Sequence, residues 1–194
     1  MDAKRFRLAI FASGSGTNAE AIMTYFAHDP TTEVVLLLSN NPKAYALERA
    51  KTFNVPARVF NRSQFLDRHG VEKWLEEAHV THIVLAGFLW LIPQHLLDHC
   101  PQRIVNIHPA LLPRFGGKGM YGSKVHEAVK ESGERQTGIT IHLVNEHFDE
   151  GKILFQATCP VDSDDSPEDI ATKVHALEHT HYAKVIKEFL LASG

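Results

Sequence analysis

The sequence has few cysteines and lacks a long apolar run. Only Cys100 and Cys159 are present; they lie far apart and do not have the spacing of metal ligands, so disulfide bonds are not expected. The apolar run near the start soon reaches glycines and is too short for a signal peptide. No later stretch approaches the roughly 20 apolar residues of a membrane-spanning helix. We therefore expect a cytoplasmic protein with no membrane partner.

The chain also lacks an excess of positive charge. The net charge is −3, and the lysines and arginines are scattered along the chain, so a nucleic-acid partner is not expected. The chain has 194 residues, 44% of them hydrophobic, which is enough for one domain with a substantial core. There is no internal repeat and no linker-like segment. We expect residues 1–194 to form a single domain that binds small-molecule substrates as a monomer or weak homodimer.

Short apolar segments alternate with amphipathic ones. The unbroken run VVLLL at 34–38 is typical of a strand buried on both faces of a parallel sheet. Repeated β-α-β units predict an α/β fold with a doubly wound, mostly parallel, Rossmann-like sheet, followed by an antiparallel hairpin and a final helix. We expect strands at 7–12, 34–38, 57–60, 82–86, 103–107, 140–144 and 153–158, helices at 18–27, 44–53, 63–78, 93–98, 123–131 and 167–190, and a long loop at 109–122.

A glycine-rich turn at 13–18 joins the first strand to the first helix. Amides at the start of a helix favour an anion, and a single phosphate is the preferred ligand. The turn also fits the dinucleotide pattern G-x-G-x-x-A on Gly14, Gly16 and Ala19. That pattern requires an acidic residue at the end of the second strand, where this chain has 39–41, Ser-Asn-Asn. No lysine follows the glycines, which excludes a P-loop. A tight turn without a ligand remains an alternative.

Asn106 and His108 end the fifth expected strand. Residues two apart in a strand face the same side, so the amide and the imidazole can donate hydrogen bonds to one point. Two such donors can stabilise a developing oxyanion in acyl transfer. A carboxylate beside His108 would raise its pKa and favour the cation, and Asp149 or Glu150 in the hairpin loop can supply it. The alternative is that Asn106 caps a turn, His108 packs in the core and Asp149 only forms a turn.

A second constellation is His175-Ala176-Leu177-Glu178-His179, which matches the H-x-x-E-H pattern of some zinc proteases. His175 and His179 would share one face of a helix and could bind zinc. A catalytic zinc needs a third protein ligand, and few residues follow. We expect a chance match in a histidine-rich chain, and we expect no metal in the site.

The runs V-N-I-H-P-A-L-L-P at 105–113, G-S-G-T-N at 14–18 and A-G-F at 86–88 resemble the motifs of the folate-dependent formyltransferases. The similarity covers nearly the whole chain. The resemblance implies transfer of the formyl group of 10-formyltetrahydrofolate to the primary amine of glycinamide ribonucleotide, in purine biosynthesis. It implies catalytic roles for Asn106, His108 and Asp149.

The same resemblance implies two groups of binding residues. Those for the ribonucleotide phosphate and ribose are Gly16, Thr17, Asn18, Pro109 and Glu178. Those for the folate are Leu89, Trp90, Leu91, Ile92, Val144, Asn145, Glu146, His147 and Phe148.

Three rival functions share parts of this pattern. A hydrolase of 10-formyltetrahydrofolate would use water in place of the amine, but such relatives carry an N-terminal regulatory domain and none fits before residue 7. Formyltransferases that act on another amine usually carry a C-terminal extension. A non-catalytic nucleotide sensor would not need Asn106, His108 and a carboxylate to converge.

Overall fold

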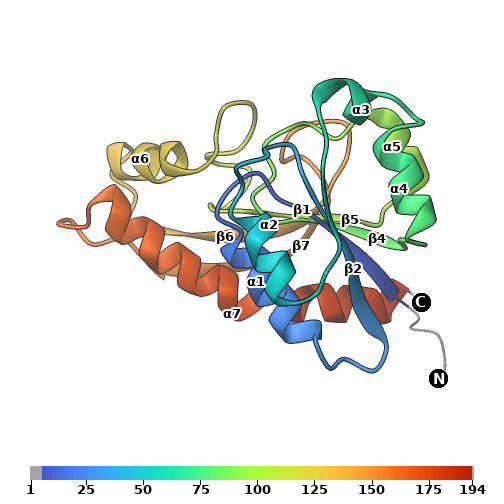
Figure 1. Cartoon of the computed structure of the whole chain (residues 1–194). Helices are drawn as coiled ribbons and strands as arrows, with labels where there is room; N and C mark the ends of the chain where they lie inside the picture. Colours follow the sequence, from blue (N-terminus) through green and yellow to red (C-terminus); the bar gives the residue numbers. More distant parts are fainter. Residues whose placement is uncertain (1–5, 194) are drawn as a thin grey trace. The chain divides into compact units, whose positions relative to one another are not determined.

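The computed structural model describes residues 6–193, and Figure 1 shows the path of the chain. Seven strands form one mostly parallel sheet in the order β3-β2-β1-β4-β5-β6-β7. The chain divides into two compact units, one ending at Val105 and the other beginning at Asn106. The expected α/β class and the antiparallel end of the sheet are confirmed. The strands are β1 (Phe6–Phe11), β2 (Thr32–Ser39), β3 (Ala57–Val59), β4 (His82–Leu85), β5 (Ile104–His108), β6 (Gln136–Leu143) and β7 (Ile153–Pro160).

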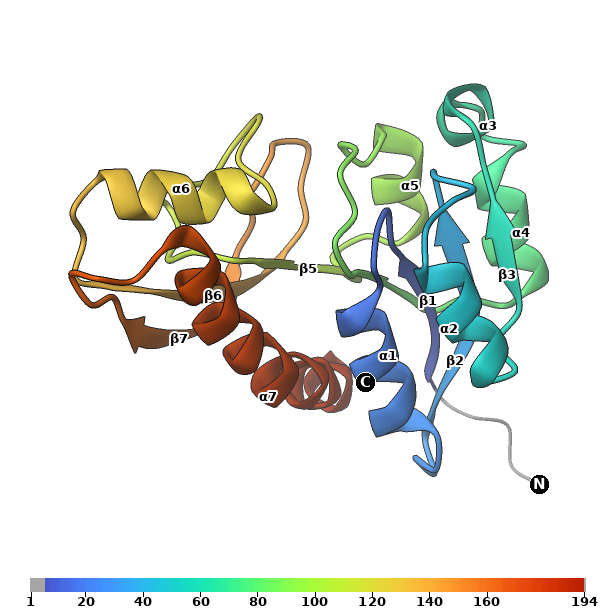
Figure 2. The same ribbon diagram turned by 60° about the vertical axis from the view of Figure 1, so that its left-hand side comes forward.

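In the first unit, β1 pairs in parallel with β2 and with β4, and β2 pairs in parallel with β3. Leu37 and Leu38 of β2 are fully buried, because helices cover both faces of these strands. Figures 1 and 2 show α1 and α2 on one side and α4 and α5 on the other. The helices of this unit are α1 (Thr17–Phe26), α2 (Ala46–Thr52), α3 (Arg62–Leu66), α4 (Val71–Glu77) and α5 (Gln94–His99).

The single helix expected at 63–78 was wrong, because the segment forms α3 and α4 with a turn between them. The side chain of Asp67 accepts a hydrogen bond from the amide of His69 at 2.9 Å within this turn. A Cβ atom at Gly70 would lie 2.0 Å from the carbonyl oxygen of Gln64. The glycine therefore lets the turn fold back tightly onto α3, a contact that helical periodicity does not reveal.

In the second unit, β6 and β7 form the expected antiparallel hairpin. Gly151 lies at its turn, where a Cβ atom would come within 1.7 Å of the carbonyl oxygen of Leu143. Helix α7 (Pro167–Ser193) packs against both strands and against α6 (Ser123–Glu131). The hydroxyl of Ser166 accepts a hydrogen bond from the amide of Asp169 at 3.1 Å, which confirms the expected helix start. No helix among the described residues is long and apolar enough to cross a membrane.

Candidate active site

The structure brings Asn106, His108 and Asp149 together within the second unit. Asn106 and His108 lie two positions apart on β5, and Asp149 lies in the connection between β6 and β7. The Asp149 carboxylate contacts both: Oδ2 is 3.4 Å from Nδ1 of His108, and Oδ1 accepts a hydrogen bond from Nδ2 of Asn106 at 3.5 Å. The convergence inferred from strand alternation therefore holds.

A fourth polar residue, His142 on β6, belongs to the same cluster and was missed in the sequence. Its Nδ1 lies 2.8 Å from the carbonyl oxygen of Leu143, which can only accept, so Nδ1 carries a proton. In a neutral ring Nε2 is then an acceptor, and Nδ2 of Asn106 donates to it at 3.1 Å. Nε2 also lies 3.6 Å from Oδ1 of Asp149. The only available signal was a histidine at a strand position whose neighbours are apolar.

The amide of Asn106 is therefore oriented by two partners. Its two N–H hydrogens point toward His142 and Asp149, and the contact to Asp149 is the longer of the two. A ligand oxygen that accepts from this amide would have to replace one of these contacts, and the weaker bond to Asp149 is the easier one to exchange.

His108 is almost fully buried and both of its ring nitrogens face oxygen atoms. Nε2 lies 2.7 Å from the carbonyl oxygen of Phe115, so Nε2 donates this hydrogen bond. The distance from Nδ1 to Asp149 exceeds the 2.7–2.9 Å typical of a charge-assisted hydrogen bond. This geometry fits a neutral ring with its proton on Nε2.

The pKa of His108 moves opposite to the expected direction. Burial lowers the pKa, and the neighbouring Asp149 and the Phe115 carbonyl raise it by less, so the pKa lies below its usual value. Asp149 does raise the pKa of His108, as expected, but burial lowers it by more, so the expected predominance of the cationic form is not found. For Asp149, burial raises the pKa, but hydrogen bonds donated to the carboxylate, among them that of the Gly117 amide, lower it by more, so the carboxylate stays ionised.

The backbone around His108 adopts uncommon conformations. Phe115 and Asp149 have φ values of +56° and +59°, in the left-handed region that non-glycine residues rarely occupy. The amide of Gly117 donates to Oδ2 of Asp149 at 3.0 Å, and a Cβ atom at Gly116 would lie 3.3 Å from Cβ of Asp149. The irregular loop at 109–122 thus packs directly on the carboxylate.

The glycine-rich turn lies in the first unit and is closely packed. Gly16 has a φ of +75°, and a Cβ atom there would lie 2.6 Å from Cα of Ala46. Helix α1 begins after Gly16 without a side chain that caps its amides. Donors that follow β2 bind three successive carbonyls of the turn: Nδ2 of Asn41 to Ser13 (3.1 Å), the amide of Ala46 to Gly14 (3.2 Å) and Nε of Arg49 to Ser15 (2.9 Å).

The turn therefore directs its carbonyls toward the protein, which suits a backbone that presents amides to an anion. Thr17 and Asn18 form the first turn of α1. The strand β2 ends in Ser39, and Asn40 and Asn41 follow, so no carboxylate stands where a dinucleotide ribose would need one.

The other expected binding residues differ in exposure. Leu89 and Leu91 are exposed, whereas Ile92 is buried. Trp90 packs against Phe60 and Phe65, with the guanidinium of Arg62 4.9 Å from its ring centre. In the second unit, Glu146 and His147 are exposed, while Pro109, Val144, Asn145 and Phe148 are partly buried.

Glu178 on α7 is buried. His175 and His179 are exposed. Among the described residues, the group with metal-ligand geometry is Glu72, Glu76 and His99, and not the H-x-x-E-H pattern of α7. Among residues 6–193, His175 and His179 find no third ligand, which a catalytic zinc needs.

Comparisons with known proteins show the family of the chain. The formyl transferase family model matches residues 6–186. The chloroplastic phosphoribosylglycinamide formyltransferase of Arabidopsis thaliana is 42% identical over 189 residues, which cover 94% of this chain and 65% of that protein. The Bacillus subtilis phosphoribosylglycinamide formyltransferase is 36% identical over 189 residues, covering 95% and 94%. The chain spans 65% and 61% of the length of two plant relatives.

Solved structures show the same fold. The phosphoribosylglycinamide formyltransferase of Anaplasma phagocytophilum superposes with a TM-score of 0.87 at 33% identity, covering 95% of this chain and 86% of the other. That of Bacillus halodurans gives 0.86 at 36% identity and covers 97% of each chain. A family match along almost the whole chain, joined to relatives of this similarity, shows that the chain belongs to the formyl transferase family.

Proposed function

We propose that this chain transfers the formyl group of 10-formyltetrahydrofolate to the primary amine of glycinamide ribonucleotide, a step of purine biosynthesis. The observation that carries the proposal is the convergence of Asn106, His108 and Asp149 within one unit. The names of the relatives that cover almost this whole chain support the substrates.

In the proposed reaction the neutral amine attacks the formyl carbon, and the formyl oxygen becomes an oxyanion. The Nε2–H of His108, which donates to the Phe115 carbonyl, is redirected to that oxygen. An N–H of Asn106 provides the second donor in place of its long bond to Asp149. Two preorganised donors in a buried site stabilise developing charge more than water does.

The second step moves a proton and breaks a bond. The attacking nitrogen loses a proton, the departing folate nitrogen gains one, and the bond between the formyl carbon and the folate nitrogen breaks. Asp149 is ionised and partly buried, so it is suited to hold the water that carries the proton. The reaction needs neither a metal nor a covalent intermediate.

The binding roles are part of the same proposal. Amides of the turn at Gly16, Thr17 and Asn18 bind the ribonucleotide phosphate, supported by the anchored carbonyls of that turn. The ribonucleotide also contacts Pro109 and Glu178. The folate contacts Leu89, Trp90, Leu91, Ile92, Val144, Asn145, Glu146, His147 and Phe148.

We also propose that residues 1–194 act as one formyltransferase domain, in the cytoplasm, as a monomer or weak homodimer without a nucleic-acid partner. The family match across the boundary between the two units supports the single domain.

A direct assay tests the function. Purified protein is mixed with 10-formyltetrahydrofolate with and without glycinamide ribonucleotide, and release of tetrahydrofolate is followed by absorbance. We expect release only when the ribonucleotide is present, with the formylated ribonucleotide appearing in equal amount. Release that does not depend on the amine would identify a hydrolase instead, and no release with either mixture would refute both functions.

A further inference from the structure

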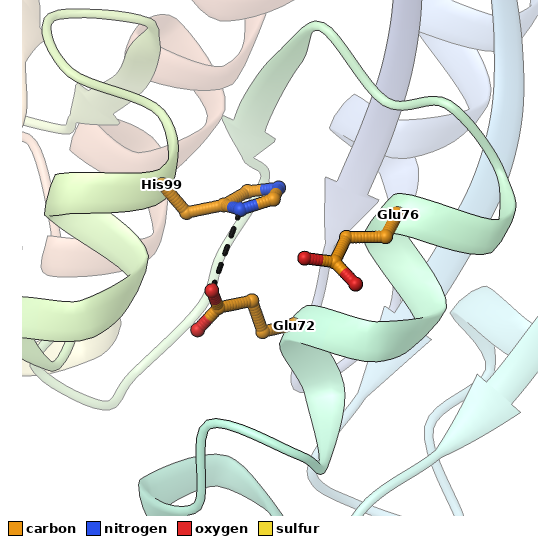
Figure 3. Close-up of side chains that lie close together, drawn as sticks. All are labelled: Glu72, Glu76 and His99. Atoms are coloured by element: carbon orange, nitrogen blue, oxygen red, sulfur yellow. Dashed lines mark ion pairs between the residues drawn. The ribbon is translucent and has the colours of Figure 1, made fainter.

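A cluster of metal-ligating side chains lies on α4 and α5, within the first unit. Glu72 and Glu76 are four residues apart on α4, so they share one face of the helix. His99 is at the end of α5 and presents its ring to them. Figure 3 shows the two carboxylates and the imidazole directed toward one another. One ligand atom from each residue lies within 4.8 Å of the other two.

The spacing suits a metal ion better than a direct ion pair. Nδ1 of His99 lies 3.5 Å from Oε1 of Glu72, longer than a charge-assisted hydrogen bond. Zinc binds nitrogen and oxygen at about 2.0–2.2 Å, so two ligands of one tetrahedral ion lie roughly 3.4 Å apart. Glu76 is exposed, and a small rotation of its side chain would bring its carboxylate to the same separation.

A buried histidine orients the central ligand. Nδ1 of His95 lies 2.8 Å from Oε2 of Glu72, and Nε2 of His95 lies 3.1 Å from the carbonyl oxygen of Phe65. Only one carboxylate oxygen of Glu72 is used in this way, and the other faces His99. Metal sites commonly fix a ligating carboxylate through this kind of outer hydrogen bond.

A simple network of ion pairs between α4 and α5 does not explain Glu76. Among residues 6–193, its carboxylate has no hydrogen-bond or ion-pair partner. Two carboxylates four residues apart on a helix repel each other, which is unfavourable without a cation. His95 contacts one carboxylate oxygen of Glu72, and among residues 6–193 Glu76 has no such contact. A bound cation would relieve this repulsion.

The ligand types indicate which ion binds. Magnesium and calcium prefer oxygen ligands alone, whereas an imidazole with two carboxylates suits zinc and similar divalent transition metals. Three protein ligands leave a fourth position for water, and the partial exposure of the cluster gives the ion access from solvent. We propose that Glu72, Glu76 and His99 form a binding site for a zinc-class divalent metal ion that links α4 to α5.

The test uses the full chain and Zn²⁺ alone, in a buffer without chelators. Isothermal titration is expected to show one equivalent bound tightly, and a roughly 100-fold excess over Kd is expected to raise Tm by about 5 °C. Co²⁺ in place of Zn²⁺ is expected to give the visible absorption bands of a four-coordinate ion with nitrogen and oxygen ligands.

Matched variants locate the site. Glu76→Gln and His99→Gln are expected to weaken Zn²⁺ binding at least about tenfold and to abolish the rise in Tm. Glu77→Gln is the control, because this exposed carboxylate on the same helix pairs with Arg58 and lies outside the cluster. His179→Gln controls for adventitious binding by an exposed histidine.

Circular dichroism in the absence of metal checks that each variant is folded. Glu76→Gln is the more informative variant, because its exposed side chain has little part in packing. Unchanged Zn²⁺ affinity in this variant, the absence of a bound equivalent in the parent, or an equal loss of affinity in the two controls would overturn the proposal. None of these measurements depends on formyl transfer.

Discussion

His108 in the second unit and His99 in the first unit each lie beside a carboxylate, but in different surroundings. His108 is almost completely buried, its Nε2 donates to the Phe115 carbonyl, and Asp149 is held by Asn106 and Gly117. His99 is partly exposed, and its distance to Glu72 leaves both groups able to bind another ligand. The same pair of residue types is therefore fixed by hydrogen bonds in a buried site in one unit, and is open to solvent and to a further ligand in the other.

The largest expected effect comes from removing the amide of the buried site. Asn106→Ala should lower kcat about 10²- to 10³-fold, because one donor to the oxyanion is lost. Tetrahydrofolate release measured under saturating substrates checks this, with circular dichroism to establish that the fold persists. Turnover close to that of the parent would remove Asn106 from the mechanism.

The next largest effect is expected when the buried pair of His108 and Asp149 is broken. Asp149→Asn should lower kcat about 10²-fold while keeping the turn, because asparagine tolerates the left-handed backbone found at this position. Since Asp149 raises the pKa of His108, its neutral replacement should lower that pKa further. An NMR titration of the His108 ring measures the shift, with Glu150→Gln as the control. An upward shift of the pKa would contradict this account of the pair.

His126 can be compared with His108 and His99, because it is buried without a carboxylate. Burial first, and then His175 and His108, lower the pKa of His126 to about 4, and its Nδ1 has no hydrogen-bond partner among residues 6–193. The unfolded chain binds this proton near pH 6.5 and the folded chain only near pH 4. Folding stability should therefore fall as the pH falls through this window.

In His126→Leu, the loss of unfolding free energy on going to low pH should be smaller than in the parent by about 2–3 kcal/mol. Urea unfolding at pH 7.5 and at pH 4.5 gives the difference, and His28→Leu, at an exposed position, should leave it unchanged. Equal losses of stability in the parent and in His126→Leu would show that other groups carry the effect.

The smallest expected effect concerns the residue that orients the amide. His142→Phe should lower kcat about tenfold with little change in KM, because Asn106 would lose the acceptor that directs its N–H group. His142→Gln, which keeps an acceptor, should recover part of the rate. A merely structural role would lower stability in both variants without separating their kcat values.

The parts of the fold that depend on local sequence could be predicted, whereas those that depend on contacts between distant residues could not. The buried strand at 34–38 followed from its unbroken apolar run. The contact of both Asn106 and His108 with Asp149 fits the two-residue period of a strand. The break between α3 and α4 depends on the contact between Gly70 and Gln64, which periodicity does not show.

The chemistry of the site was harder to foresee than its location. The direction of the His108 pKa was missed because the degree of burial outweighs a visible carboxylate neighbour. His142 was missed because a histidine between apolar strand residues does not reveal its partner, Asn106, until the neighbouring strand is in place. The cluster on α4 and α5 was missed because Glu72 and His99 are brought together only by tertiary packing.

The anchored carbonyls of the glycine-rich turn have a consequence for folding. Their donors, Asn41, Ala46 and Arg49, come from the segment that follows β2. The amides of α1 therefore reach their final orientation only after that later segment has docked on the turn. A phosphate would bind to a turn that is already rigid, so little conformational entropy would be lost on binding. The affinity of the chain for phosphate would then report directly on whether the first β-α-β-α unit has folded.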